Sequence, residues 1–297
     1  MACFDAVPMP PSLAVYPLDK KRGGIDITGR NPSARFKGAV FGDGPDGRKQ
    51  GSTKLSGSRN SYVLIPNTGK LDPRYTITVL IWVYPVRSRG IVLTYNPSRK
   101  GFQLRIISPR KLLLEMVERT RRTTIRVSTP RPVIERKIWN YIGVTYSMKS
   151  KRVTFWVNSK AIATKVIGKV ELDTRGSIRL GGYRGSRDFF KGLLSCLQVY
   201  NVELTSRQIE EAKKRCFLKG EMKSLSCWNH VVSFQIHSRL ICFSSVSFHT
   251  DKNLCLAFLY VSNLCDIFFS EYRSFTLRFI CSVTLSPKCE LALRFSP

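Results

Sequence analysis

The stretch YTITVLIWVYP, residues 75–85, has the pattern of a β-strand that buries one face and exposes the other. One side of the extended chain carries the apolar residues Ile77, Val79, Ile81 and Val83. The other side carries Thr76, Thr78, Leu80 and Trp82, and Pro85 ends the run. Alternation with a period of two predicts a strand whose first set of side chains faces a hydrophobic core.

Shorter runs with the same alternation occur along the chain up to residue 200, separated by Gly, Pro, Asn and Asp. They cover 61–65, 90–95, 102–107, 111–117, 123–128, 138–146, 152–157, 161–167, 177–181 and 193–200. No long helical period interrupts them before position 204. So many short strands predict an all-β fold in which two stacked antiparallel sheets each bury one face.

One helix is expected at the end of this region. Thr205 and Gln208 have the spacing of a capping box, and Ile209 and Ala212 supply an apolar stripe. The pattern predicts a short helix from about Ser206 to Arg215 that closes the domain.

Composition divides the chain near residue 216. Of the 20 Gly, Gly220 alone lies beyond that point, whereas ten of the 17 Phe and six of the nine Cys lie there. Turns of an all-β domain need Gly to reach positive φ. We therefore predict an extension over 1–11, one domain over 12–216, and a Cys/Phe/Ser-rich tail over 217–297 that is poorly structured and not a folded domain. The alternative is that its six cysteines staple a small disulfide domain.

Neither end of the chain has a clear membrane or export signal. The longest apolar run, 254–269, is broken by Ser262, Asn263 and Asp266, whereas a membrane span needs about 20 apolar residues. Residues 1–12 lack a basic start followed by an apolar run, so we expect no signal peptide in this chain.

Several segments together resemble the laminin G-like, concanavalin A-like lectin jelly-roll domains. They are YPLD (16–19), DITGRN (26–31), LSGSRNSYVLIPNTGKLDPRYTITVLIWVYP (55–85), IWNYIGVTYS (138–147), VTFWVNSK (153–160), IRLGGY (178–183) and FKGLLSCLQVYNVELTSRQIEEAKKRC (190–216). The resemblance spans 12–216 in the family's order. It implies a two-sheet antiparallel jelly-roll sandwich that serves as an extracellular module of recognition or adhesion.

The resemblance also implies a disulfide between Cys196 and Cys216, because similar domains tie their C-terminal segment onto the last strand there. Closing this loop would stabilise the fold by about 3 kcal/mol and fits an oxidising, extracellular location. The alternative is a pair of buried free thiols.

No cofactor is expected, and calcium has one weak candidate ligand. In similar domains an Asp in a D-x-x-G-x-N turn binds Ca²⁺ together with an acid near the last strand. Asp26 matches the turn, but Ser195 and Cys196 occupy the place of that acid. Since Ca²⁺ prefers several charged oxygen ligands, the alternative is that Asp26 hydrogen-bonds its own turn.

We expect no enzymatic activity. All three histidines lie beyond residue 216, so residues 1–216 hold no Ser-His-Asp or Cys-His triad. Glycoside hydrolysis needs a pair of carboxylates. The nearest pattern is Glu171-Leu172-Asp173, and Arg175 stands where a third acid would follow.

Residues 1–216 are strongly basic, with 41 Lys+Arg against 15 Asp+Glu and a net charge of +26. Arginines concentrate between 119 and 137, and lysines between 149 and 169. We predict a basic ligand-binding face that carries no core and consists of Arg119, Arg121, Arg122, Arg126, Lys151 and Arg152. Arginine suits sulfate because its planar fork matches such anions. The alternative is a set of dispersed, solvated charges.

These observations predict a non-catalytic extracellular domain that binds glycans, in particular sulfated glycosaminoglycans, or matrix proteins. Two alternatives stay open: a structural module of a larger matrix or receptor protein without its own ligand site, and a carbohydrate-active enzyme. The sequence contains no nucleic-acid-reading motif, and neither nucleic acid nor membrane is favoured as a partner.

Overall fold

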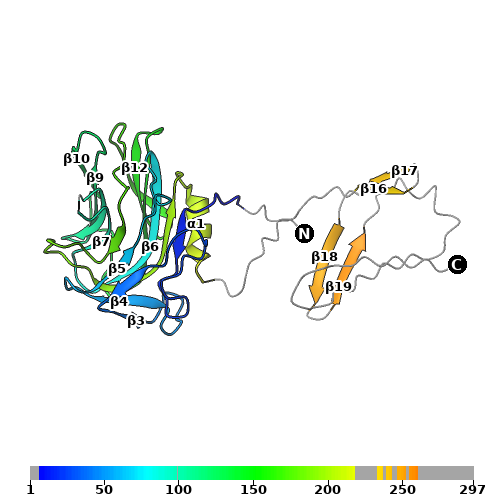
Figure 1. Cartoon of the computed structure of the whole chain (residues 1–297), viewed down its shortest axis with the longest axis horizontal. Helices are drawn as coiled ribbons and strands as arrows, with labels where there is room; N and C mark the ends of the chain where they lie inside the picture. Colours follow the sequence, from blue (N-terminus) through cyan, green and yellow to red (C-terminus); the bar gives the residue numbers. More distant parts are fainter. Residues whose placement is uncertain are drawn as a thin grey trace. The chain divides into compact units, whose positions relative to one another are not determined.

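The computed structural model describes residues 7–98 and 100–217, and the backbone of four short strands in the tail. Two sheets and one helix account for the regular structure up to residue 217. Figure 1 shows the sheets as two layers, with α1 against the outer side of the layer that contains β6.

The eight-stranded sheet has the order β13-β12-β11-β6-β15-β4-β3, and β1 also pairs with β15. Its strands are β1 (Ala14–Tyr16), β3 (Ala39–Gly42), β4 (Ser52–Ser56), β6 (Thr76–Pro85), β11 (Asn140–Ser147), β12 (Arg152–Val157), β13 (Lys160–Val166) and β15 (Lys191–Tyr200). All these pairings are antiparallel.

The seven-stranded sheet has the order β10-β9-β8-β7-β14-β5-β2 and is also antiparallel. Its strands are β2 (Arg35–Lys37), β5 (Tyr62–Ile65), β7 (Gly90–Tyr95), β8 (Phe102–Ile107), β9 (Lys111–Val117), β10 (Thr124–Ser128) and β14 (Ile178–Leu180). The chain changes sheet around β2, around β5, after β6, after β10 and around β14, which gives the predicted jelly-roll sandwich.

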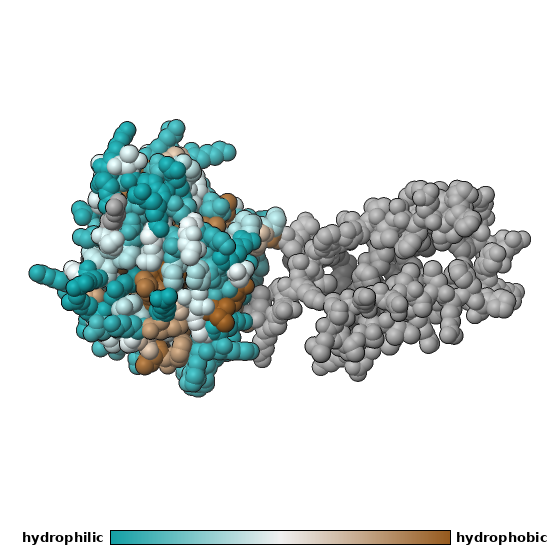
Figure 2. All heavy atoms as spheres, viewed as in Figure 1, coloured by the Kyte–Doolittle hydropathy of each residue, from teal (hydrophilic) through white to brown (hydrophobic). Residues whose placement is uncertain are grey.

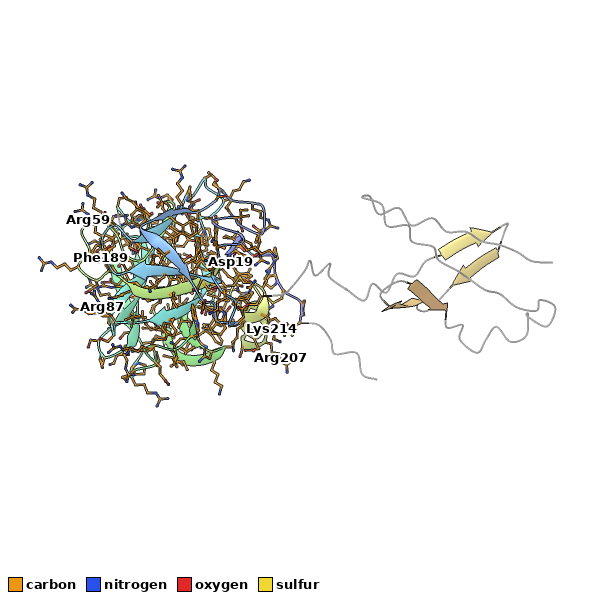
Figure 3. All side chains as sticks on the ribbon, turned by 90° about the horizontal axis from the view of Figure 1, so that it is seen from below. Asp19, Arg59, Arg87, Phe189, Arg207 and Lys214 are labelled. Carbon is orange, nitrogen blue, oxygen red and sulfur yellow. A yellow bond between two sulfur atoms is a disulfide. The ribbon has the colours of Figure 1, made fainter. Side chains whose placement is uncertain are left out.

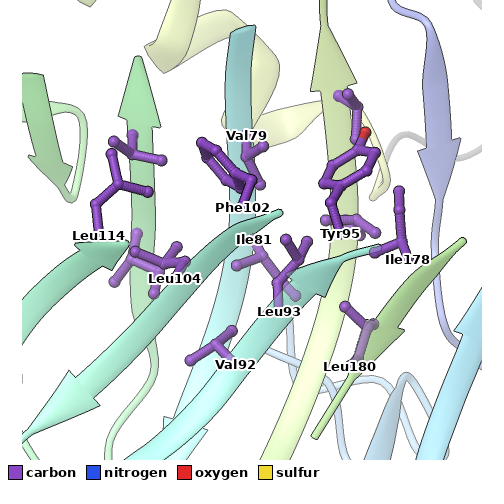
Figure 4. Close-up of a cluster of buried hydrophobic side chains, with 14 of the residues drawn as sticks. Val79, Ile81, Val92, Leu93, Tyr95, Phe102, Leu104, Leu114, Ile178 and Leu180 are labelled. Carbon is purple, nitrogen blue, oxygen red and sulfur yellow. The ribbon is translucent and has the colours of Figure 1, made fainter. Parts of the chain in front are cut away.

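The core lies between the two layers. Val79 and Ile81 of β6 point toward Leu93, Phe102 and the other inward side chains of the seven-stranded sheet (Figure 4). These residues have no exposed surface, and the alternation read from 75–85 predicts their direction correctly.

The outer faces of the two sheets differ. The helix face is the outer face of the eight-stranded sheet, where Leu80, Tyr141 and Trp156 pack against Ile209 and Ala212 of the helix. The polar face is the outer face of the seven-stranded sheet. Figure 2 shows the visible surface of the sandwich largely as hydrophilic residues, with a few apolar patches.

Helix α1 (Ser206–Lys214) ends one residue before the predicted limit of Arg215, and Arg215 is its C-cap. Thr205 accepts a hydrogen bond from the backbone N–H of Gln208, whose side chain accepts from the N–H of Thr205. This reciprocal capping satisfies backbone donors at the helix start, and the predicted capping box is confirmed.

Four strands before residue 61 were not predicted. β1 and β4 are short, while β2 and β3 are mostly exposed and carry no clear alternation of apolar residues. Their pairing partners are distant in sequence, as between β1 and β15. Local periodicity therefore could not identify them.

Two ends of the chain were predicted to lie outside the domain. In residues 7–11, Met9 packs beside the helix-face cluster, and the Pro8 carbonyl accepts a hydrogen bond from the Gln208 side chain. This segment therefore contacts the sandwich.

The chain divides into two compact units, residues 1–221 and residues 222–297. The tail forms the hairpins β16 (Ser233–Ile236) with β17 (Arg239–Cys242), and β18 (Val246–Asp251) with β19 (Leu254–Leu259).

The prediction that 217–297 is not a folded domain stays a prediction, since most of the tail lies outside the described residues. No helix in the described part of the chain is long and apolar enough to span a bilayer.

Candidate functional site

Arg119 does not lie on a free outer face, contrary to the prediction. Its side chain is 9% exposed, with Nη2 2.5 Å from Asp72 Oδ2 and Nε 3.7 Å from Glu171 Oε1. It lines a pocket of about 540 Å³ with Asp72, Arg74, Thr120, Glu171 and Arg175. The turn after β9 folds against the segment around Glu171, so this arginine is engaged in structural ion pairs.

Arg122 and Arg126 are exposed but paired with acids. Arg122 Nη1 lies 2.5 Å from Oδ2 of Asp173, which has no exposed surface, and Arg126 Nε lies 2.6 Å from Glu115 Oε1. Burial alone would raise the pKa of Asp173, but hydrogen bonds from Arg175 and Arg122 hold it below its usual range. Removing Arg122 would therefore leave part of a buried charge unpaired, so this position affects stability.

Arg121, Lys151 and Arg152 are all exposed, but they do not share one sheet face. Arg121 follows β9 of the seven-stranded sheet, whereas Arg152 begins β12 of the eight-stranded sheet and Lys151 directly precedes it. Arg121 and Lys169 line a cleft of about 570 Å³ that also includes Met148. The prediction of a single basic sheet face is therefore wrong, because the two groups of cations belong to opposite layers.

Asp26 is 3% exposed and holds its own turn together. Its carboxylate accepts hydrogen bonds from the N–H groups of Val15, Thr28 and Asn31, and from the side chains of Thr28 and Asn31. These bonds lower its pKa although burial would raise it. The geometry favours the turn-holding interpretation, and no group of three metal-binding side chains occurs among the described residues.

Cys196 and Cys216 form the predicted disulfide, with Cα atoms 5.8 Å apart. Both residues are buried beside Val15, and Phe217 packs next to them. The bond connects the segment after α1 to β15, the neighbour of β6, β4 and β1 in the eight-stranded sheet.

One row of paired residues crosses the whole polar face. Its members, from β10 to β2, are Arg126, Glu115, Gln103, Thr94, Arg179, Leu64 and Arg35. Neighbouring strands lie about 4.8 Å apart, so the row presents a continuous line of side chains across seven strands. Six of its seven members are polar or charged, and Leu64 is the seventh.

Cations without a carboxylate partner gather at the β2 end of this row. Arg35 and Lys37 on β2, Arg59 before β5, and Arg179 on β14 form no ion pair with any described acid. The Arg179 guanidinium carbon lies 3.6 Å from the centre of the Tyr62 ring, and Nη2 donates to the Arg59 carbonyl. We call these four cations with Tyr62 the cationic corner.

The cationic corner concentrates charge of one sign. Burial lowers the pKa of Arg179, and the like charge of Arg59 works in the same direction. Figure 3 shows Arg59 projecting from the side of the domain opposite to α1, which carries Arg207 and Lys214. An anion bound here would relieve the repulsion.

Alternation in the sequence indicates the direction of the Arg179 side chain. Arg179 stands between Ile178 and Leu180, which alternation directs into the core, so its own side chain must point outward. Arg35 and Lys37 gave no comparable signal because β2 was not predicted.

A family model described as the concanavalin A-like lectin/glucanases superfamily, of the laminin G type, matches residues 56–210. No curated protein sequence matches the chain.

Solved structures with the same fold share little sequence with this chain. Domain 4 of AbnA, a GH43 extracellular arabinanase from Geobacillus stearothermophilus solved with arabinotriose, has a TM-score of 0.53 and 18% identity over 68% of this chain and 97% of that domain. A solved chain of botulinum neurotoxin type C has a TM-score of 0.54 and 13% identity over 70% of this chain and 51% of its own. This chain thus spans about half of that toxin chain.

The ligand-binding domain of botulinum neurotoxin serotype D was solved with N-acetylneuraminic acid. It has a TM-score of 0.53 and 11% identity over 94% of this chain and 68% of its own. At these identities the similarity concerns the fold. Together with the family match over 56–210, it shows that the chain belongs to the concanavalin A-like lectin/glucanases superfamily.

Proposed function

We propose that this protein is a non-catalytic, extracellular glycan-binding domain whose ligands are anionic glycans such as sulfated glycosaminoglycans. The observation that carries the proposal is the cationic corner on the polar face. It replaces the six residues expected from the sequence, of which Arg126 alone belongs to the same strand row.

Charge supports this ligand class. The sandwich region carries a net charge of +26, and its described ion pairs leave Arg35, Lys37, Arg59 and Arg179 without an acid. Guanidinium groups bind sulfate and carboxylate through parallel hydrogen bonds, and stacking on the Tyr62 ring orients the Arg179 guanidinium.

Similar structures support a glycan as the ligand. The arabinanase domain was solved with arabinotriose and the type D toxin domain with N-acetylneuraminic acid. Entry of the type C toxin into cells depends on interaction with two ganglioside molecules.

The state of two acids supports a non-catalytic role. Glu171 contacts Arg74 and Arg119, while Asp173 contacts Arg122 and Arg175. A general acid needs a raised pKa, whereas the pKa of Asp173 is lowered by its arginine neighbours despite burial. The disulfide supports an oxidising, extracellular location.

Heparin-affinity chromatography of the full chain tests the proposal. The test variant is the triple change Arg35→Ser, Lys37→Ser and Arg59→Ser. The control is Lys151→Ser, Lys160→Ser and Lys165→Ser, which removes the same charge from exposed positions of the other sheet. The test variant should elute at clearly lower salt than the control, and both at lower salt than the unchanged protein.

Equal elution of the two triple variants would contradict the cationic corner as the binding site. Such a result would mean that heparin senses the overall charge of the domain. Thermal unfolding of both variants checks that neither has lost its fold.

A further inference from the structure

Four buried polar atoms on the polar face have no hydrogen-bond partner among the described residues. They are Gln103 Nε2, Thr94 Oγ1, Arg105 Nε and Arg179 Nε, four of the ten such atoms in that part of the chain. Gln103 is 1% exposed and Thr94 is 0% exposed. A buried polar group without a partner costs stability, so its persistence calls for a physical reason.

These atoms are neighbours in the sheet. Gln103 pairs directly with Thr94, and Thr94 pairs directly with Arg179. Arg105 lies two residues beyond Gln103 on β8, which places it on the same face. The four residues therefore form one cluster across β8, β7 and β14.

The cluster is rich in donors. The Gln103 amide nitrogen and both arginine Nε atoms can only donate, whereas the Thr94 hydroxyl can donate or accept. Two acids lie beside it: Glu115 pairs with Gln103 in the row, and Asp188 contacts Arg105. Both already hold the terminal nitrogens of Arg105, at 2.8 and 2.9 Å, and so leave its Nε free.

We infer that this donor cluster is the subsite that holds one anionic group of the glycan, a sulfate or a carboxylate. The inference rests on the proposed function and extends it from the cationic corner to a defined set of atoms. Glu115, Arg105 and Arg179 neighbour Gln103 and Thr94 in the sheet and are partly exposed, so the anion would reach the cluster by displacing these long side chains. The anion supplies acceptors to the atoms that Glu115 and Asp188 leave without a partner.

Two near-isosteric substitutions test the inference in the full chain: Gln103→Leu and Thr94→Val. Each removes an unpartnered polar atom, so the melting temperature should stay equal or rise. Binding to a polyanion at fixed salt should fall on the order of tenfold, the size expected for a lost hydrogen bond to a charged group. Isothermal titration would use heparin, dextran sulfate, which carries sulfate alone, and hyaluronan, which carries carboxylate alone.

Thr53→Val is the matched control. Thr53 is equally buried, but its hydroxyl donates to the Leu18 carbonyl at 2.7 Å on the other sheet. This variant should melt at a lower temperature and bind all three polyanions as the unchanged protein does.

Loss of binding to dextran sulfate assigns the subsite to sulfate, and loss of binding to hyaluronan assigns it to carboxylate. Unchanged affinity of Gln103→Leu and Thr94→Val for all three ligands would overturn the inference while leaving the proposed function standing. A lower melting temperature of both variants would also overturn it, because the atoms would then serve the fold. Failure of the unchanged protein to bind any of the three would refute the proposed function itself.

Discussion

Gln103 and Gln198 are the same residue type, both buried, on the outer faces of opposite sheets. Gln198 Nε2 donates to the Ala212 carbonyl at 2.8 Å, and its Oε1 accepts from the Tyr200 hydroxyl at 2.8 Å. Gln103 Nε2 has no such partner within the described chain. The helix face thus uses its glutamine to fix α1 on the sheet, whereas the polar face keeps donor capacity available for a ligand.

Other residues on the two faces follow this division only in part. On the helix face, Thr78 donates to the Val202 carbonyl and Trp156 Nε1 donates to Thr145, whereas Trp82 Nε1 and Tyr141 Oη have no described partner. On the polar face, Thr94 has no described partner. Removing buried apolar side chains from the helix face should reduce stability, while changes at exposed, unpaired positions of the polar face should mainly alter binding.

The largest effect is expected for Trp156→Ala on the helix face. Trp156 is 9% exposed and belongs to the cluster under α1, so its loss should lower the free energy of unfolding by about 4 kcal/mol. Urea unfolding followed by circular dichroism measures this. As a control, Lys37→Ala, an exposed position of the polar face that forms no ion pair with a described acid, should leave the midpoint unchanged, and a large drop there would contradict the proposed division.

A smaller effect is expected for Gln198→Leu. The substitution removes one of the two hydrogen bonds to the Ala212 carbonyl and the acceptor of the Tyr200 hydroxyl proton, and should reduce stability by about 2 kcal/mol. Gln103→Leu, measured beside it, should cause no loss. Equal destabilisation by both substitutions would mean that the two glutamines serve the same structural role.

The smallest effect on stability is expected for Glu115→Gln. Burial would raise the pKa of Glu115, but hydrogen bonds from Arg126 and Arg105 lower it further than burial raises it. A lowered carboxyl pKa stabilises the fold above the unfolded pKa, and this contribution is lost as pH falls through the folded pKa. The variant should therefore unfold at lower urea than the unchanged protein at pH 7. The difference should begin to shrink as pH falls below about 4.3, the ordinary pKa of Glu, and vanish below the lower pKa of the folded state.

Glu115→Gln should also change how strongly the polar face binds a polyanion. Without the carboxylate charge, Arg105 and Arg126 become available to a polyanion. Glu115→Gln should consequently elute from heparin at higher salt than the unchanged protein, and earlier elution would argue against binding on this face.

Much of the fold could be predicted from the sequence, because a sandwich imposes a period of two on its buried strands. Ile77, Val79 and Phe155 face inward as expected, and the capping box at Thr205 begins α1. The short strands β2 and β3 could not be found this way, since their exposed side chains leave no apolar alternation.

The binding residues were harder to predict because net charge does not reveal pairing. Arg119 and Arg122 appear free in the sequence, yet Asp72 and Asp173, 47 and 51 residues away along the chain, neutralise them. The orphaned atoms of Gln103 and Thr94 depend on the register of three strands. Such information exists only after the sheet has formed.

The disulfide has a mechanical consequence for any chain that follows residue 216. Tension applied beyond Cys216 passes through the sulfur–sulfur bond directly to Cys196 on β15. The closed loop of residues 197–215, which includes α1, carries none of this force. The force therefore acts on β15, which is hydrogen-bonded to β6 and β4. The sheet resists the force, and α1 keeps its contacts with the helix face.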